Sequence, residues 1–138
     1  MLFLGIDGGG STCRAVVIDE FDKTVFQGQG GASNFSSTPA RTLRRSVARA
    51  LEAAPKVDQI CGCFAGLINS EARDRARELV GTLLPDCPIT LTADYAAALR
   101  ASPPDTTACL IAGTGSIVCS ITPEGYVKSG GGGPLLGD

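Results

Sequence analysis

The stretch "LGIDGGGSTCRAVVID", residues 4–19, passes from apolar residues into Asp7, three glycines and two hydroxyl residues, and then becomes apolar again. The flanking runs are short and rich in β-branched residues, as is typical of strands. Glycines between two strands predict a tight turn whose backbone N–H groups can surround an anion such as phosphate. The stretch therefore predicts a β-hairpin with an anion-binding turn.

Asp7 stands where the first strand meets this turn, and its carboxylate would repel a phosphate. A Mg²⁺ ion held by Asp7 against phosphate oxygens would remove the repulsion. The alternative is that Asp7 caps its own turn in a hairpin that binds nothing. A second strand, glycine turn and strand, "ACLIAGTGSIVCSI" at 108–121, repeats the pattern and favours phosphate binding.

The two common nucleotide motifs do not fit these loops. In a dinucleotide-binding fold or a P-loop the glycine turn opens a helix, whereas here it opens a strand. The pattern GxxxxGK[ST] is missing, and no GxGxxG follows Asp7.

Composition limits the class of protein. The chain has 138 residues, 43% hydrophobic and 19% charged, enough for an apolar core. A net charge of −2 argues against nucleic-acid and membrane partners, and without a signal peptide or membrane span we expect a cytoplasmic protein. The arginines within 41–49 fit a solvated helix face better than a nucleic-acid site. Histidine is absent, which excludes a Ser-His-Asp triad.

The cysteines are expected to be small buried thiols rather than disulfides or metal ligands. Most of them lie in apolar, strand-like runs: Cys13, Cys61, Cys63, Cys109 and Cys119.

The periodicity along the chain predicts an α/β fold. Strands are expected at 2–7, 13–19, 24–29, 59–66 and 89–92, and helices within 37–54, 69–84 and 93–101. In the first helix Ser37 or Thr38 is expected to cap, with Pro39 at the first helical position. A Pro-rich joint at 102–107 precedes the second glycine unit.

The two glycine loops, in this order, resemble the phosphate loops of the acetate kinase, sugar kinase, heat-shock protein 70 and actin superfamily. The triple-glycine loop, "GASN" at 31–34 and "GGGGPLLGD" at 130–138 resemble the BadF/BadG/BcrA/BcrD ATPase family, in particular its N-acetylglucosamine and glucosamine kinases. The resemblance implies a ribonuclease H-like (actin-like ATPase) domain over 1–104, with a mixed five-stranded sheet flanked by helices. Residues 105–138 would be the incomplete start of a second such domain.

The same resemblance implies a set of site residues. Asp7 would hold the magnesium and Asp94 would be the catalytic base. The phosphate loops would be Gly8, Gly9, Gly10, Ser11 and Thr12, and Gly113, Thr114, Gly115 and Ser116. The sugar would be bound by Asn34, Gly66, Asp94 and Asp138.

Two of these residues also have ordinary structural interpretations. Asp94 follows a predicted strand and begins a predicted helix, which suits an N-cap. The carboxyl end of a strand is equally where α/β proteins bind ligands. Asn34 is as typical of a turn as of a ligand site.

The function implied is ATP- and Mg²⁺-dependent phosphorylation of an amino sugar, N-acetylglucosamine or glucosamine. One alternative is an activator ATPase for a radical dehydratase or reductase; another is a non-catalytic module that senses a nucleotide or a sugar. Because relatives continue past "LLGD", the chain is expected to be part of an enzyme and inactive alone. The exposed edges of 108–121 predict association, with a homodimer as the expected state.

Overall fold

The computed structural model describes residues 1–113 and 116–130. The chain divides into two compact units, Met1–Ala93 and a second that begins at Asp94. This division falls earlier than the boundary expected at about residue 104, because the helix that follows Ala93 packs against the strands of the second unit. A domain boundary near 104 therefore stays a prediction.

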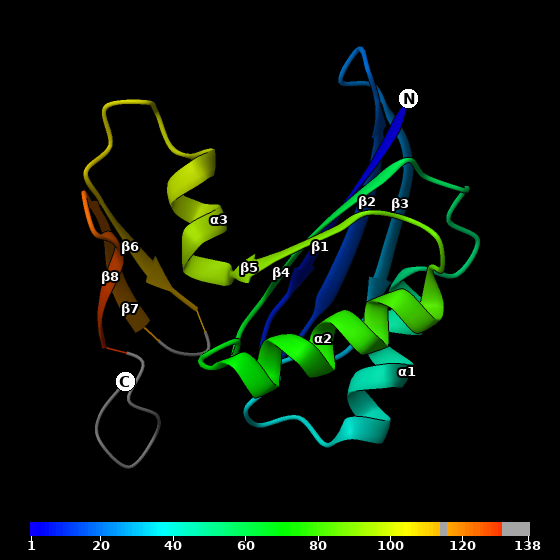
Figure 1. The fold of residues 1–138 in the computed structure, drawn as a ribbon, viewed down its shortest axis with the longest axis horizontal. Coiled ribbons are helices and arrows are strands. Elements are labelled where there is room, and N and C mark those ends of the chain that lie inside the picture. Colours follow the sequence, from blue (N-terminus) through cyan, green and yellow to red (C-terminus); the bar gives the residue numbers. More distant parts are fainter. Residues whose placement is uncertain (114–115, 131–138) are drawn as a thin grey trace. The chain divides into compact units, whose positions relative to one another are not determined.

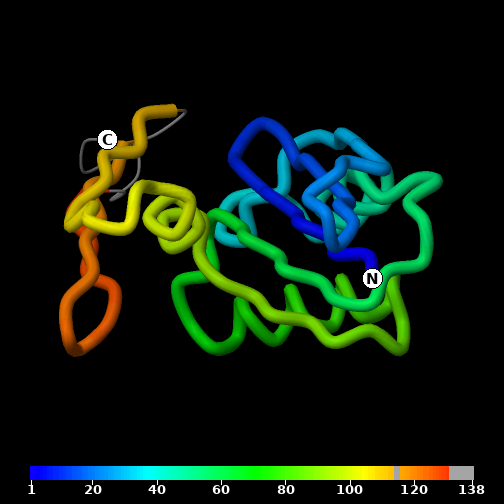
Figure 2. Tube along the Cα trace, turned by 90° about the horizontal axis from the view of Figure 1, so that it is seen from above, coloured from blue at the N-terminus to red at the C-terminus, as the bar shows by residue number. Residues whose placement is uncertain are grey.

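The first unit is built on a five-stranded sheet in the order β3-β2-β1-β4-β5. Its strands are β1 (Leu2–Gly8), β2 (Cys13–Asp19), β3 (Thr24–Gly30), β4 (Gln59–Phe64) and β5 (Ile89–Ala93). The first three form an antiparallel meander, while β4 and β5 run parallel to β1. The traces of β4 and β5 can be followed side by side in Figure 2. The mixed α/β sheet expected from the sequence is confirmed.

Two helices cover one face of this sheet, as Figure 1 shows. They are α1 (Ala40–Ala50), between β3 and β4, and α2 (Ser70–Leu83), between β4 and β5. Alternate residues of each strand point at the helices because side chains alternate across a strand. The buried core that results contains Leu4, Ile6, Val17, Val47, Ile60, Phe64, Ala76 and Val80.

Helix α1 begins one residue later than the sequence suggested. Pro39 is the N-cap, with an extended ψ of 141°, and no side chain caps the helix. Neither Ser37 nor Thr38 is therefore the cap. Their backbone N–H groups instead donate to the Asn34 carbonyl, at 3.4 and 2.9 Å, and form the turn that leads into the helix.

The backbone of α1 lies directly against β3. A Cβ added at Gly30 would overlap the Ser46 carbonyl, and one at Gly28 would overlap that of Ala50. The glycines that alternate along "GQG" are therefore required by the close approach of the helix.

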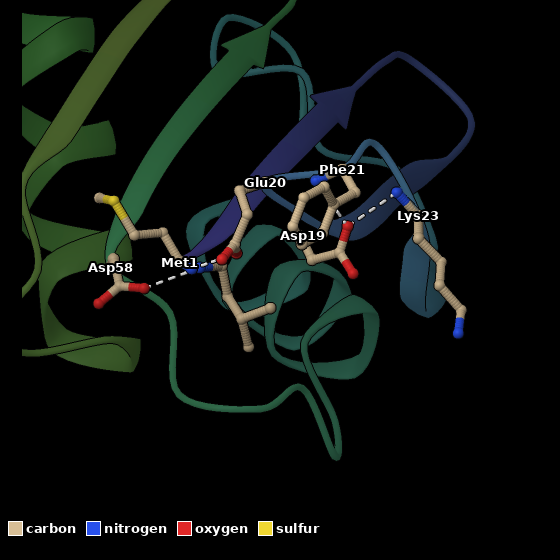
Figure 3. A network of polar contacts seen from close by, with 7 residues as sticks. Met1, Asp19, Glu20, Phe21, Lys23 and Asp58 are labelled. Carbon is tan, nitrogen blue, oxygen red and sulfur yellow. Dashed lines mark hydrogen bonds and ion pairs between the residues drawn. The ribbon is translucent and has the colours of Figure 1, made fainter.

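The amino-terminal edge of the sheet is held by polar contacts, drawn in Figure 3. The Met1 ammonium pairs with Glu20, and this hydrogen bond lowers the pKa of the Glu20 carboxyl. The Leu2 N–H donates to Asp58 Oδ2 at 2.7 Å. Asp19 Oδ1 accepts from the N–H groups of Phe21 and Lys23 in the β2–β3 turn, at 2.9 and 3.0 Å.

The second unit contains α3 (Asp94–Ala101) and a three-stranded antiparallel sheet of β6 (Ala108–Ala112), β7 (Ser116–Thr122) and β8 (Gly125–Gly130). Strand β8 was not predicted. The helix contacts this sheet through aromatic and polar groups: the Tyr95 and Tyr126 rings lie 6.4 Å apart, and Arg100 Nε donates to the Tyr126 hydroxyl at 3.0 Å.

The cysteines only partly match the expectation of buried thiols. Cys13 and Cys119 are buried, but Cys63 and Cys109 are half-buried, and Cys61 is exposed. Cys61 is exposed because it lies on the face of β4 opposite to α1 and α2. In the described part of the chain no helix is long and apolar enough to cross a membrane.

We expect Gly30→Ala to destabilise the protein, because the new Cβ has no room beside the Ser46 carbonyl. Overpacking of this kind costs about 1–3 kcal/mol or more of unfolding free energy, measurable by urea denaturation. The matched control is Gly81→Ala in α2, where a Cβ would lie 3.7 Å from Ile89 Cδ1. This control should stabilise the protein by roughly 0.5–1 kcal/mol. An unchanged stability for Gly30→Ala would contradict the direct contact of α1 with β3.

Candidate functional site

The glycine loop between β1 and β2 forms the tight turn that its sequence predicts. The Gly9 N–H donates to the Thr12 carbonyl at 2.8 Å, so this turn is closed by a backbone hydrogen bond. Asp7 lies before the turn, in β1, and its side chain is exposed. The role of Asp7 as a metal ligand therefore stays a prediction.

Backbone hydrogen bonds join the glycine loop to two other loops. The Ala65 N–H, just after β4, donates to the Gly8 carbonyl at 2.7 Å. The Ser33 N–H, in the segment after β3, donates to the Gly9 carbonyl at 2.9 Å, and the Phe35 N–H donates to the Ala65 carbonyl at 2.9 Å. The segments that follow β1, β3 and β4 are therefore tied together at one edge of the sheet.

Tight packing lies beneath these bonds. Ser33 and Phe64 are fully buried, and the rings of Phe64 and Phe35 meet edge to face with centroids 5.2 Å apart. A Cβ at Gly8 would collide with the Phe64 ring and lie 2.8 Å from Ser33 Oγ. Burial raises the pKa of the neighbouring Cys13 thiol, which keeps that thiol neutral below the loop.

Asn34 and Gly66, predicted as sugar-binding residues from separate parts of the sequence, are neighbours in the structure. Asn34 Oδ1 accepts from Ser36 N–H at 2.8 Å and from Ser36 Oγ at 2.7 Å. Gly66 has φ of +81°, and a Cβ there would overlap Asn34 Oδ1. The left-handed backbone and the crowding both require glycine at 66.

A charged residue that the sequence analysis missed lies beside Asp7. Arg14 of β2 is directly opposite Asp7 of β1, on the sheet face that α1 and α2 do not cover, and it is exposed. Cys63 of β4 is the neighbour of Asp7 on its other side. Asp7 and Arg14 are equally far from the centre of the turn, so the sequence could have indicated that they are opposite each other. That inference requires the register of the hairpin, which the sequence alone does not fix.

The last residue of β5 lies at the same edge of the sheet. Gly8, Phe64 and Ala93 are register partners at the carboxyl ends of β1, β4 and β5. Asp94 is the next residue after Ala93 and the first of α3. It is half-buried, and its Oδ1 accepts from the Tyr95 N–H at 2.9 Å. An N-cap would accept from a later N–H of the helix, so this contact is not the expected cap.

The second glycine turn lies in the second unit. Gly113 follows β6 and Ser116 begins β7, so the two strands predicted on either side of the glycine segment are present. Three further predicted site residues lie outside the described residues: Thr114, Gly115 and Asp138.

Asp7 offers a single carboxylate to a magnesium ion. Among the residues that the structure describes, no three His, Cys, Asp or Glu side chains are placed to hold a metal together. Mg²⁺ is commonly held by one or two carboxylates, water and substrate phosphates, and a single exposed Asp7 beside a glycine turn suits this arrangement.

Two shallow surface hollows lie on the sheet of the first unit. One, of about 360 Å³, is lined by residues of β2 and β3 that include Arg14 and Gln29. The other, of about 270 Å³, includes Phe3 and Cys61. Neither is lined by Asp7, Asn34 or Gly66. Asn34 and Gly66 lie against each other outside these hollows.

Comparison with known proteins relates this fold to kinases. The chain is 31% identical to the glucosamine kinase GspK of Vibrio cholerae, over 93% of this chain and 46% of the relative. A Chromobacterium violaceum structure, provisionally named an N-acetylglucosamine kinase, superposes with a TM-score of 0.67 at 23% identity, over 99% of this chain and 51% of that one.

A further solved relative is a ROK family glucokinase from Streptomyces griseus, in complex with glucose and AMPPNP. It gives a TM-score of 0.61 at 19% identity, over 92% of this chain and 46% of that one. The chain thus spans about half the length of the relatives that it matches.

These structural likenesses identify the actin-like ATPase fold of the first unit and agree with its mixed sheet. The BadF/BadG/BcrA/BcrD ATPase family matches residues 4–138, nearly the whole sequence. The chain belongs to the BadF/BadG/BcrA/BcrD ATPase family.

Proposed function

We propose that this chain carries the phosphate and sugar sites of an ATP-dependent amino-sugar kinase. The single observation that carries the proposal is the set of backbone hydrogen bonds that ties the glycine loop at Gly9 to the segments containing Asn34 and Gly66. A kinase must hold a phosphate donor beside an acceptor hydroxyl, and these bonds join the candidate residues for each. The similarity to a glucosamine kinase supports an amino sugar as the acceptor.

Charge at the glycine loop suits a nucleotide. Asp7 would hold Mg²⁺, which when bound neutralises part of the phosphate charge. The loop from Gly8 to Thr12 would donate N–H groups to phosphate oxygens, apart from the Gly9 N–H, which closes the turn. The exposed guanidinium of Arg14 adds a positive charge opposite Asp7. In the second unit, Gly113 to Ser116 would form the matching loop.

Asp94 is the proposed base. Its carboxylate would accept the proton of a sugar hydroxyl while that oxygen attacks the γ-phosphorus of ATP. The new oxygen–phosphorus bond forms as the bond to the β-phosphate oxygen breaks, giving ADP and a sugar phosphate. Asn34, Gly66 and Asp138 would orient the sugar, so that the reaction depends on positioning and charge.

This chain matches about half of the length of its relatives. The proposed activity is therefore that of the whole protein. The second domain, the homodimer and the cytoplasmic location stay predictions from the sequence.

The decisive experiment uses the whole protein, not this chain alone. The purified protein is incubated with Mg²⁺ and γ-labelled ATP and, in separate reactions, with glucosamine, N-acetylglucosamine or glucose. We expect label to move to an amino sugar faster than to glucose or water. ATP hydrolysis that no sugar stimulates would overturn the kinase proposal and favour an activator ATPase.

Asp7→Asn should abolish Mg²⁺-dependent tightening of ATP binding while leaving the fold intact, because Asp7 is exposed at the end of a strand. Calorimetry of ATP binding with Mg²⁺ and with EDTA measures this. Asp22→Asn is the matched control, since Asp22 is exposed in a left-handed turn that Asn also tolerates. Equal Mg²⁺-ATP affinity in Asp7→Asn and the parent would exclude the metal role.

Asp94→Asn should lower kcat by about a hundredfold or more, as expected when a general base is lost, with a much smaller change in sugar KM. Asn can still accept the hydrogen bond from the Tyr95 N–H, so the start of α3 is preserved. Steady-state kinetics together with a thermal melt check both points. A lower melting temperature with unchanged turnover per folded molecule would instead assign Asp94 a structural role.

A further inference from the structure

Polar side chains form a row across the five-stranded sheet of the first unit, on the face that α1 and α2 do not cover. The members of this row are register partners from β3 to β5: Gln29, Arg14, Asp7, Cys63 and Thr92. The row lies one residue before the ends of β1, β4 and β5, next to the glycine loop. Its charged members are Asp7 and Arg14.

The adjacent row on the same face carries no charge. Its members, again from β3 to β5, are Gln27, Val16, Gly5, Cys61 and Thr90. Asp7 and Arg14 are therefore an isolated pair of opposite charges within these two rows, beside the glycine loop.

Asp7 and Arg14 do not pair with each other. Opposite charges that face each other across two strands commonly interact. In the part of the chain that the structure describes, however, neither side chain makes an ion pair, and both are exposed. Arg14 borders a hollow of about 360 Å³ together with Gln27 and Gln29, whose amides are uncharged. The carboxylate and the guanidinium are thus both open to ions from solution.

We infer that Arg14 binds the phosphate chain of the nucleotide directly, while Asp7 holds the accompanying Mg²⁺. An unbridged carboxylate and guanidinium match a magnesium ion and a phosphate group, one ion for each charge. The inference rests on the proposed function and deepens it, because it adds a charged side chain to a loop whose other phosphate donors are backbone N–H groups and hydroxyls.

A guanidinium supplies what the glycine loop lacks. The Gly9 N–H already donates to the Thr12 carbonyl, so this backbone donor is not available to a phosphate. Arg14 presents several N–H donors in a planar fork that fits two oxygens of one phosphate group. Its charge also offsets the repulsion between Asp7 and a phosphate when no metal is bound.

The alternative is a structural ion pair between Asp7 and Arg14 that forms in solution and supports the hairpin. Exposed pairs of this kind contribute little to stability. The two interpretations differ in what a ligand detects. A phosphate-binding Arg14 affects ATP and ADP but not adenosine, which has no phosphate, whereas a structural pair affects unfolding alone.

The test is calorimetric titration of the whole purified protein with ATP, ADP and adenosine, each with Mg²⁺ and with EDTA. Arg14→Gln keeps a polar side chain and removes the charge. We expect ATP and ADP to bind about tenfold to a hundredfold more weakly, the loss expected for hydrogen bonds to a charged group, and adenosine to bind as before. An equal loss for adenosine, or no loss for ATP, would overturn the inference.

Metal-free binding separates the role of Arg14 from that of Asp7. In EDTA, Arg14→Gln should weaken ATP binding, whereas Asp7→Asn should strengthen it because a carboxylate no longer repels the phosphates. The loss caused by Arg14→Gln should persist when Asp7→Asn is also present, since the guanidinium contacts the phosphate itself. A loss that disappears in this double variant would mean that Arg14 acts only through Asp7, against the inference.

Arg44→Gln is the matched control. Arg44 is exposed on α1, which covers the other face of the sheet, and its replacement changes the net charge by the same amount. Its affinity for each ligand should equal that of the parent, because salt screens a charge on the far side of the sheet. Both arginine variants should melt near the parent temperature. A lower melting temperature for Arg14→Gln with unchanged nucleotide affinity would assign Arg14 to a structural ion pair instead.

A measurement on the parent protein does not depend on the folding of a variant. In ¹⁵N NMR spectra the Arg14 Nε–H resonance should shift on titration with ADP and stay in place with adenosine. A resonance that ADP leaves unmoved would contradict direct contact.

Two outcomes separate the inference from the proposed function. A parent protein that binds neither ATP nor ADP would overturn both. A parent protein that binds ATP while Arg14→Gln binds it equally well would overturn the inference and leave the proposed function standing.

Discussion

The hydrogen bond from the Ala65 N–H to the Gly8 carbonyl, 2.7 Å long, is the contact on which the site depends. It joins the last residue of β1 to the first residue after β4, and so fixes where the glycine loop begins. The N–H groups of Ser33 and Phe35 then attach the third segment to the carbonyls of Gly9 and Ala65. Ser33 and Phe64 are fully buried beside these bonds, so the joined loops lie on a packed base.

Much of the first unit could be predicted from the sequence because its signals are local. The short β-branched runs on either side of "GGGST" predicted the hairpin, and the helical periodicity within 37–54 predicted α1. The glycine turn needs nothing but its own residues to form. The resemblance to a known family then supplied Asn34, Gly66 and Asp94 as candidates, though not their contacts.

Other features depend on register and packing, which no local pattern encodes. Arg14 reaches its place opposite Asp7 only through the pairing of β1 with β2. Cys61 is exposed despite its apolar surroundings, because exposure depends on which sheet face the helices cover. Pro39 became the N-cap since the Asn34 carbonyl had already bonded the N–H groups of Ser37 and Thr38, an interaction invisible in residue propensities.

The close contact of α1 with the glycines of β3 has a consequence for the entropy of ligand binding. The segment from Gly31 to Pro39 joins two elements whose backbones are in contact, so packing fixes the positions of both of its ends. A loop that is ordered in the free protein loses little conformational freedom on binding, and more of its contact energy is expressed as affinity. Because β3 has glycine at 28 and 30, α1 can pack against its backbone. This contact helps to preorganise the segment that contains Asn34.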